Sequence, residues 1–363
     1  MDAPLPDLPR KGRGAISNAT PRFERQRKVR IDDGWGSAAG EDEEEPPRLA
    51  TTVTIDASRT VIARNESPDI GFDRSVNPYR GCEHGCIYCY ARPSHAFLGL
   101  SPGLDFETRL VAKPAAPALL AEELRKPGYR VEPLALGSNT DPYQPIEREM
   151  KITRGILEVL SAFNHPLTIT TKSVLVLRDL DILAPMAARG LVQVGISVTT
   201  LDPALARSME PRAPAPRRRL AAIRSLSEAG IPTAVMAAPM IPALNDSELE
   251  RILEAAAEAG ATAASYVLLR LPLEIKDLFS EWLTAHAPAR AKHVLSLVRA
   301  VRGGRLNDPN FGSRFRGEGP YAELIRTRFK LARKRLGLER RNWRPDCSQF
   351  KPPPRAGDQL KLL

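Results

Sequence analysis

The sequence predicts an α/β fold in which strands and helices alternate around a parallel sheet, and three observations carry this prediction. Short apolar runs rich in β-branched residues recur about every 30 residues, helix-like periodicities lie between them, and a glycine often separates a helix from the next strand. Six strands can be counted, which is fewer than the eight of a closed TIM barrel. The sheet is therefore expected to be barrel-like or doubly wound.

The elements can be assigned in order along the chain. The six expected strands cover residues 72–77, 134–136, 167–171, 192–198, 233–238 and 263–268. Four intervening helices are marked by apolar residues at helical spacing: Ile156, Leu157, Leu160 and Phe163; Leu180, Leu183 and Ala187; Ala222, Ile223 and Leu226; Leu249, Ile252, Leu253 and Ala256. Gly190, Gly230 and Gly260 stand where helices are expected to end. Asp246 and Ser247 are expected to cap the helix that follows them.

Composition divides the chain into three regions. Residues 1–67 are expected to form a disordered or extended tail, because a basic block and the acidic run 41–45 offer little apolar surface to bury. Residues 68–300 hold the strand and helix pattern and form the expected core domain. Residues 301–363 form a basic C-terminal extension.

The positive charge is confined to the C-terminal end. The chain carries a formal charge of +10, and residues 299–363 hold 17 basic residues against 6 acidic ones. Residues 325–336 combine a basic face with apolar residues at helical spacing, namely Ile325, Phe329, Ala332 and Leu336. Arg340, Arg341, Trp343 and Arg344 follow. The protein is expected to contact nucleic acid through residues 299–363. The alternative is a solvated charged face on a helix that covers the core.

Other classes of protein are disfavoured by composition. Four cysteines in 363 residues are too few for a disulfide-built secreted scaffold, and no apolar leader or membrane-spanning run of 18 residues is visible. The expectation is a soluble, cytoplasmic protein with no membrane partner.

The strongest chemical signal is a loop of three cysteines, Cys82, Cys86 and Cys89, in a C-x3-C-x2-C array just after the first expected strand. Thiolates at this spacing can surround one soft metal centre. Three ligands without a clear fourth suit an iron–sulfur cubane with one open iron. A zinc site would need a fourth ligand, for which His84, His95 or Cys347 are available, and a metal-free thiol cluster is the third alternative.

A resemblance to a known family narrows these alternatives. The array with Tyr88 in its aromatic position resembles the signature of the radical SAM superfamily. The flanking residues 77–82 and 88–90 resemble the spore photoproduct lyase-like branch, also labelled DNA repair photolyase-like. The resemblance covers roughly residues 68–300 and implies a partial (β/α)6 TIM-like barrel.

The resemblance also implies cofactors and their contacts. Cys82, Cys86 and Cys89 would hold a 4Fe–4S cluster whose open iron binds S-adenosylmethionine (SAM), and a protein such as flavodoxin or ferredoxin would supply the electron. The expected SAM contacts are Tyr88 to adenine, the loop residues Ser138, Asn139 and Thr140 to the amino group, Lys172 to the carboxylate, and Ser197 and Arg212. A simple turn is the alternative for residues 137–143, and a hydroxyl bonded to backbone is the alternative for Ser197.

The expected function is reductive cleavage of SAM to a 5′-deoxyadenosyl radical, with nucleic acid as the substrate class. A small-molecule or protein substrate is one alternative, and a zinc-containing nucleic-acid-binding protein without catalysis is another. One feature departs from spore photoproduct lyases, which carry a hydrogen-donating cysteine in the second-strand loop. Residues 137–139 are Gly, Ser and Asn, and Tyr90, Tyr143 and Cys347 are the other candidate donors.

Overall fold

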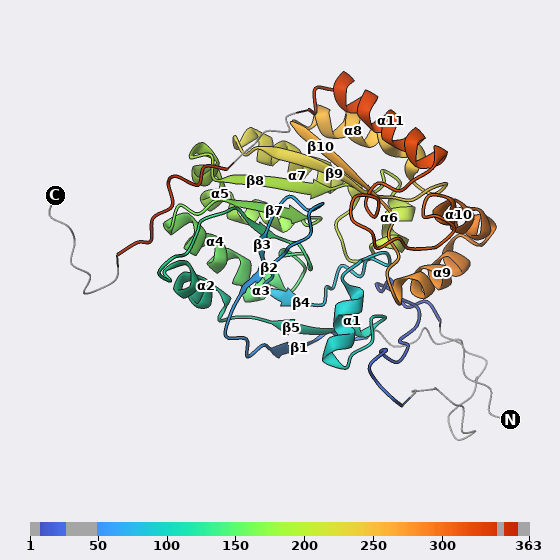
Figure 1. Cartoon of the computed structure of the whole chain (residues 1–363), viewed down its shortest axis with the longest axis horizontal. Coiled ribbons are helices and arrows are strands. Elements are labelled where there is room, and N and C mark those ends of the chain that lie inside the picture. The colour runs from blue at the N-terminus through green and yellow to red at the C-terminus, as the bar shows by residue number, and fades with distance from the viewer. Residues whose placement is uncertain (1–7, 27–48, 340–344, 355–363) are drawn as a thin grey trace.

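The main sheet has seven strands in the order β10-β9-β8-β7-β6-β3-β2, in a computed structural model that describes residues 8–26, 49–339 and 345–354 (Figure 1). Six strands pair in parallel, and β2 adds antiparallel to β3 at one edge. The bounds are β2 (Ile62–Arg64), β3 (Arg74–Val76), β6 (Leu134–Leu136), β7 (Leu167–Thr171), β8 (Val192–Ser197), β9 (Thr233–Met240) and β10 (Ala263–Leu268). All six expected strands are thereby confirmed, as is the α/β fold with an open, partial barrel.

Helices cover the outer face of this sheet, as parallel strands require. The α-helices are α1 (Asp105–Thr108), α2 (Ala116–Leu124), α3 (Glu147–Met150), α4 (Ile152–Ala162), α5 (Leu180–Ala188), α6 (Pro203–Met209), α7 (Pro216–Glu228), α8 (Leu249–Glu258), α9 (Ile275–His286), α10 (Pro288–Ala300) and α11 (Pro320–Arg335). Three 3₁₀ helices are η1 (Arg92–Leu98), η2 (Val174–Asp179) and η3 (Asp246–Glu248). The apolar faces expected for α4, α7 and α8 are buried in the core, and Gly190, Gly230 and Gly260 follow their helices with positive φ.

A second, three-stranded sheet lies beside the first and was not expected from the sequence. It has the order β1-β5-β4, with β1 (Thr52–Ile55) parallel to β5 (Arg109–Ala112) and β4 (Tyr79–Arg80) antiparallel to it. Because β4 comes three residues after β3, this sheet holds the start of the cysteine loop against the main sheet.

The expectation of a disordered or extended tail over residues 1–67 is wrong for residues 8–26 and 49–67. Residues 13–17 are buried, and β1 and β2 each join a sheet. Backbone groups make much of this contact: the amide of Val61, for example, donates to Glu123 at 2.5 Å. Bonds from the backbone do not depend on the type of side chain, so the amino-acid composition of the segment could not predict them. Residues 1–7 and 27–48 lie outside the described part of the chain.

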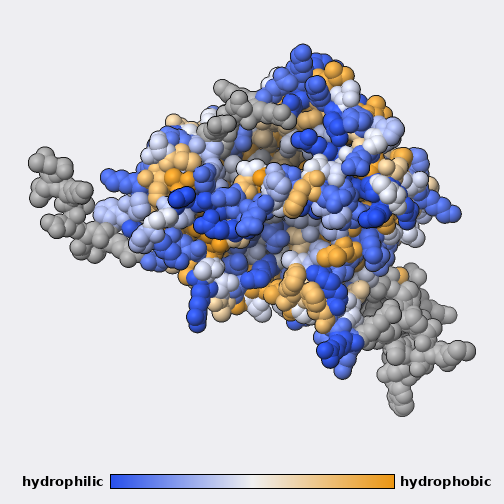
Figure 2. All heavy atoms as spheres, in the orientation of Figure 1, coloured by the Kyte–Doolittle hydropathy of each residue, from blue (hydrophilic) through white to orange (hydrophobic). Residues whose placement is uncertain are grey.

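The C-terminal helix α11 packs on α8 and β10 through the apolar face that was expected, with Phe329 against Tyr266 at a ring distance of 4.6 Å. Figure 2 shows hydrophilic residues over much of its outer surface, at the top of the view. Part of the basic face is neutralised by α8, since Arg328 pairs with Glu250 at 2.6 Å and Arg335 pairs with Glu254. Arg340, Arg341, Trp343 and Arg344 lie outside the described residues.

The expected cap at Asp246 and Ser247 is wrong. No capping bond from a side chain is made at α8, and the Asp246 carboxylate instead accepts from Tyr321 at 2.7 Å. A residue of α11, distant in sequence, outcompetes the local bond.

Two C-terminal segments close the ends of the open sheet. The loop 303–319 reaches from β10, where Leu268 donates to the carbonyl of Phe315 at 2.9 Å, to Asp69 between β2 and β3, which pairs with Arg314 at 2.5 Å. Residues 345–354 cross the amino edge of the sheet, opposite the carboxyl ends of its strands. There the backbone amide of Lys351 donates to the carbonyl of Phe163 just before β7. No helix in the described parts of the chain is long and apolar enough to cross a bilayer.

Candidate active site

The chemistry-bearing residues meet at the carboxyl edge of the main sheet. Asn77 follows β3, Ser138 follows β6, and Lys172 follows β7, and these three strands are neighbours. The Asn77 amide donates to the Ser138 hydroxyl at 3.1 Å, so the first two loops are joined directly. Parallel strands bring their carboxyl ends to one edge, which is where α/β proteins place ligands.

The cysteine loop lies at this edge and is fastened by backbone bonds. The amide of Cys82 donates to the carbonyl of Phe106 at 2.9 Å, and that of Ile87 donates to the carbonyl of Met209 at 3.0 Å. Gly81 and Gly85 have φ of 77° and 66°, a left-handed conformation that glycine adopts without strain. The loop is therefore held on both sides, by α1 and by the end of α6.

The three thiols are free of disulfides and influence one another. Cys82 and Cys86 are buried, and Cys89 is half-buried. Burial raises the pKa of Cys86 to about 12, with Lys172 opposing the rise and Glu210 and Cys89 adding to it. Burial also raises the pKa of Cys82, and the neighbouring thiols contribute. Cys82 and Cys86 are thus neutral thiols in the metal-free chain, and a metal would have to deprotonate them on binding.

The donor set fits an iron–sulfur cluster better than one zinc ion. Four ligands about 2.3 Å from one ion are needed for zinc. Within the described ranges, no three His, Cys, Asp or Glu side chains converge on one ion position. His95 is engaged with the carbonyl of Arg109 at 2.9 Å, and Cys347 lies in the segment at the opposite end of the sheet. Three soft thiols on one loop suit a larger sulfide-bridged centre that spreads its ligands apart.

Tyr88, expected at the adenine of SAM, is anchored by a buried charge network. Its hydroxyl donates to Glu210, which also accepts from Thr199 at 2.6 Å and pairs with Arg219. Glu210 and Arg219 are each 1% exposed. Burial alone would raise the pKa of Glu210, but Arg219 and Lys172 outweigh it and hold that pKa at about 2. Glu210 is therefore a fixed anion beneath the cysteine loop.

Asp141 is the second buried anion, and it joins three loops. Its carboxylate accepts from Thr171 at 2.6 Å and from the amide of Lys172 at 2.8 Å, and His84 lies 3.3 Å away. Burial works to raise its pKa, but His84 and these hydrogen bonds hold it at about 2. The alternative of a simple turn over residues 137–143 is true in part, because Asp141 also accepts from the amide of Tyr143 within its own loop.

The other expected SAM contacts lie at the same edge, and each already has a hydrogen-bond partner within the protein. The Ser138 hydroxyl and the Asn139 amide are both bonded to Asn77, and the Thr140 hydroxyl donates to the carbonyl of Tyr79. Ser197, buried at the end of β8, accepts on its carbonyl from Arg219 at 3.2 Å. Their roles toward SAM stay predictions.

Lys172 and Arg212 are the two cations expected at SAM, and they differ in their partners. Arg212 is exposed and pairs with Glu83 at 3.1 Å. Lys172 makes no ion pair within 4.0 Å among the described residues, and its ammonium lies 5.7 Å from the ring centroid of Tyr88. An unpaired ammonium beside the cysteine loop is the better receptor for a carboxylate.

Sequence reasoning did not find the supporting residues Asn77, Asp141, Glu210 and Arg219 as a network. Asn77, Asp141 and Glu210 each stand in a loop that leaves a strand or helix at the carboxyl edge, and this position was the available signal. Arg219 carried none, because an arginine on a helix is usually exposed.

Known proteins resemble this chain both in sequence and in fold. The sequence model of the radical SAM superfamily matches residues 76–256, which run from β3 into α8 and include the three cysteines. An uncharacterized protein of Mycobacterium tuberculosis is 40% identical over 242 residues, covering 65% of this chain and 71% of the relative. The chain belongs to the radical SAM superfamily.

Within that superfamily the fold is that of spore photoproduct lyase. A structure of that enzyme complexed with dinucleoside spore photoproduct superposes with a TM-score of 0.55 at 15% identity, over 78% of this chain and 79% of the other. An uncharacterized protein of Methanocaldococcus jannaschii is 32% identical over 173 residues, covering 48% of this chain and 62% of the relative.

Proposed function

We propose that this chain is an enzyme that binds a 4Fe–4S cluster through Cys82, Cys86 and Cys89 and cleaves SAM reductively. The observation that carries the proposal is three cysteines on one loop at the carboxyl edge of the sheet, two of them buried, with Lys172, which makes no ion pair among the described residues, beside them. When bound, the cluster supplies the electron that cleaves SAM to methionine and a 5′-deoxyadenosyl radical, which takes a hydrogen atom from the substrate.

The chain's own residues bind and orient SAM. Lys172 holds the carboxylate as a point charge. The loop 137–140 presents acceptors to the amino group, since Asn77 fixes that loop in place. Tyr88 supports the adenine with a ring whose hydroxyl Glu210 anchors. Ser197 and Arg212 complete the contacts, from the end of β8 and from the loop after α6.

We also propose nucleic acid as the substrate class, and Arg270 supports this. Arg270 follows β10 at the same edge, and it makes no ion pair among the described residues. Its guanidinium lies 4.8 Å from the ring of Phe315, and its Nε is buried without a hydrogen-bond partner. A cation held this way suits a phosphate. Spore photoproduct lyase, whose fold this chain shares, has been solved with a dinucleoside photoproduct bound.

The hydrogen donor differs from the cysteine of spore photoproduct lyases, because residues 137–139 contain none. Cys347 is too remote, since its segment crosses the opposite end of the sheet. Tyr143 is fully buried. Tyr90 remains as the donor, half of its surface exposed next to Cys89.

The electron partner is proposed to be a flavodoxin or ferredoxin, because each SAM cleaved consumes one electron. The test of function is anaerobic incubation of the iron-loaded protein with SAM and dithionite. DNA, RNA, protein and small-molecule extracts are then compared for stimulation of 5′-deoxyadenosine formation. Stimulation by nucleic acid alone supports the proposed substrate class, and stimulation only by a small molecule or protein overturns it.

A further inference from the structure

An N-terminal segment outside the matched family region packs directly on the cysteine loop. We call this segment, residues 10–23, the strap. Its residues 13–17 are buried, and Ala15 belongs to the same apolar cluster as Cys86, Ile87 and Tyr88. A Cβ placed on Gly14 would lie 1.9 Å from the carbonyl oxygen of Gly85, between the first two cysteines. Only glycine allows the two backbones to approach this closely.

The strap is bonded to a buried carboxylate. The amides of Gly14 and Ala15 donate to the two oxygens of Glu107 at 2.9 Å and 2.8 Å. The Arg13 guanidinium donates to the carbonyl of Glu107 at 2.9 Å. Glu107 is fully buried, so these bonds satisfy a charge that would otherwise be costly.

The same carboxylate holds the residue that supports the cysteine loop. Glu107 pairs with Arg92, and both side chains are inaccessible to solvent. Arg92 in turn donates to the carbonyls of Cys86 at 2.9 Å and Gly85 at 3.0 Å. A continuous chain of bonds therefore runs from the strap through Glu107 and Arg92 to the backbone of the second cysteine.

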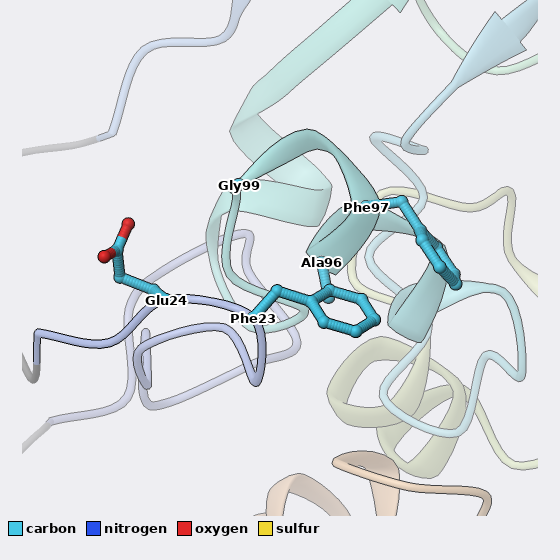
Figure 3. Close-up of a pocket in the computed structure, with 5 residues that line it drawn as sticks. All are labelled: Phe23, Glu24, Ala96, Phe97 and Gly99. Atoms are coloured by element: carbon cyan, nitrogen blue, oxygen red, sulfur yellow. The ribbon is translucent and has the colours of Figure 1, made fainter.

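The strap continues past this ion pair along η1. The amide of Leu104 donates to the carbonyl of Ser17 at 3.3 Å, and a Cβ on Gly103 would lie 2.2 Å from the same oxygen. At its far end the Phe23 ring lies 5.1 Å from that of Phe97, and the two rings flank an open pocket of about 390 Å³ (Figure 3). The contacts thus run from the cysteine loop to the 3₁₀ helix that follows it.

We propose that the strap is a working part of the iron–sulfur site: it shields the cysteine loop from solvent and small oxidants and fixes its shape through Glu107 and Arg92. The inference rests on the proposed function for the presence of the metal, and on the geometry above for the shielding. Residues 10–23 are then a positioning and shielding element rather than a tail.

The first test uses the full-length, metal-free chain, so it does not depend on the cluster. Gly103→Ala displaces the strap, because the three atoms nearest to its added methyl belong to the backbone of Ser17 and Asn18. Gly14→Ala displaces the strap at the other end. Both are expected to increase the rate at which iodoacetamide alkylates Cys86 by about tenfold, as a more frequent local opening would do. Mass spectrometry follows each cysteine.

Two controls make the comparison specific. Gly71→Ala should change nothing, because a methyl there meets no atom within 4 Å. Alkylation of Cys347, at the opposite end of the sheet, should be equal in all variants. Unchanged Cys86 rates in both strap variants would overturn the proposal. If either variant fails to fold, hydrogen exchange in the unaltered chain decides: the amides of Gly14 and Ala15 should be protected, and exchange at the rate of a free peptide contradicts the proposal.

The second test uses the reconstituted protein. Exposure to air should bleach the iron–sulfur absorbance several times faster in Gly103→Ala than in Gly71→Ala. Equal bleaching rates contradict shielding. A wild-type protein that never acquires this absorbance contradicts the proposed function instead, while the alkylation result still decides whether the strap covers the loop.

Discussion

The hydroxyl of Tyr88 donates a hydrogen bond to the carboxylate of Glu210, so the aromatic residue between the second and third cysteines is bonded to a buried anion. The bond ties the cysteine loop to the loop after α6 across 122 residues of sequence. The loop that would carry the metal is therefore anchored by charge beneath it as well as by the strap outside it.

Removing the Glu210 charge should destabilise the protein strongly. Glu210→Gln leaves the guanidinium of Arg219 buried without its partner, which costs about 3–5 kcal/mol. Tyr88→Phe removes one hydrogen bond to the Glu210 carboxylate without leaving a charge unpaired, and should cost less, about 1.5–3 kcal/mol. Urea unfolding of the metal-free chain measures both. Equal losses of unfolding free energy in the two variants would mean that the ion pair between Glu210 and Arg219 does not stabilise the fold more than the Tyr88 hydrogen bond does.

Lys172→Ala should weaken SAM binding to the iron-loaded protein. A hydrogen bond between an ammonium and a carboxylate contributes about 1.5–3 kcal/mol, or roughly ten- to hundredfold in affinity. Anaerobic titration calorimetry with SAM measures the loss. Lys330→Ala on the outer face of α11 is the matched control and should bind normally. Unchanged affinity in Lys172→Ala would remove the carboxylate contact from this lysine.

His165 should make stability depend on pH. Burial lowers the pKa of His165 to about 4, against 6.5 for an ordinary histidine. Nδ1 of the neutral ring donates to the carbonyl of Pro166 at 2.9 Å, and Nε2 accepts from the Tyr129 hydroxyl at 2.8 Å. In the unfolded chain His165 is protonated below about pH 6.5, whereas in the folded chain it stays neutral until about pH 4. Its contribution to stability is therefore full above pH 6.5 and is lost as pH falls from 6.5 towards 4, by about 2 kcal/mol between pH 7 and pH 5.

The comparison that isolates this effect is His165→Gln. Urea unfolding at pH 7 and pH 5 should show a smaller loss in the variant than in the wild type. The same loss in both proteins would contradict a buried neutral histidine between Tyr129 and Phe350.

Contact of α11 with nucleic acid should be electrostatic and modest. Arg328 and Arg335 are paired with α8, so Lys330 and Lys334 are the cations best placed to meet phosphates. Reversing both charges to Glu should lower the slope of log affinity against log salt by about two. Fluorescence anisotropy with a labelled DNA duplex measures the slope. Lys276→Glu on α9 is the control, and an equal decrease there would indicate that the basic region has no specific role.

The six parallel strands, four of the helices and the cysteine loop were predictable because their signals are local. Short apolar runs marked most of the parallel strands, and the spacing of Cys82, Cys86 and Cys89 marked the loop. The strap could not be predicted, because its contacts are made by the backbone of Gly14 and Ala15 to the distant Glu107. Asp246 failed as a cap for a related reason: its partner Tyr321 is 75 residues away.

The buried anions of the site were also hidden. Glu210 and Asp141 look like surface residues of loops, and only the packing of Arg219, His84 and Lys172 around them makes them fixed charges. Pairwise electrostatics of this kind depends on which loops meet at the edge of the sheet, which composition and spacing do not encode.

The cluster and its chemistry are tested together by anaerobic reconstitution with iron and sulfide, followed by reduction in the presence of SAM. We expect a brown protein with about four irons per chain that produces 5′-deoxyadenosine, and loss of both the iron and the product in Cys86→Ala but not in Cys347→Ala. A colourless protein that holds one zinc, or a Cys86→Ala variant that still cleaves SAM, would contradict the proposed function.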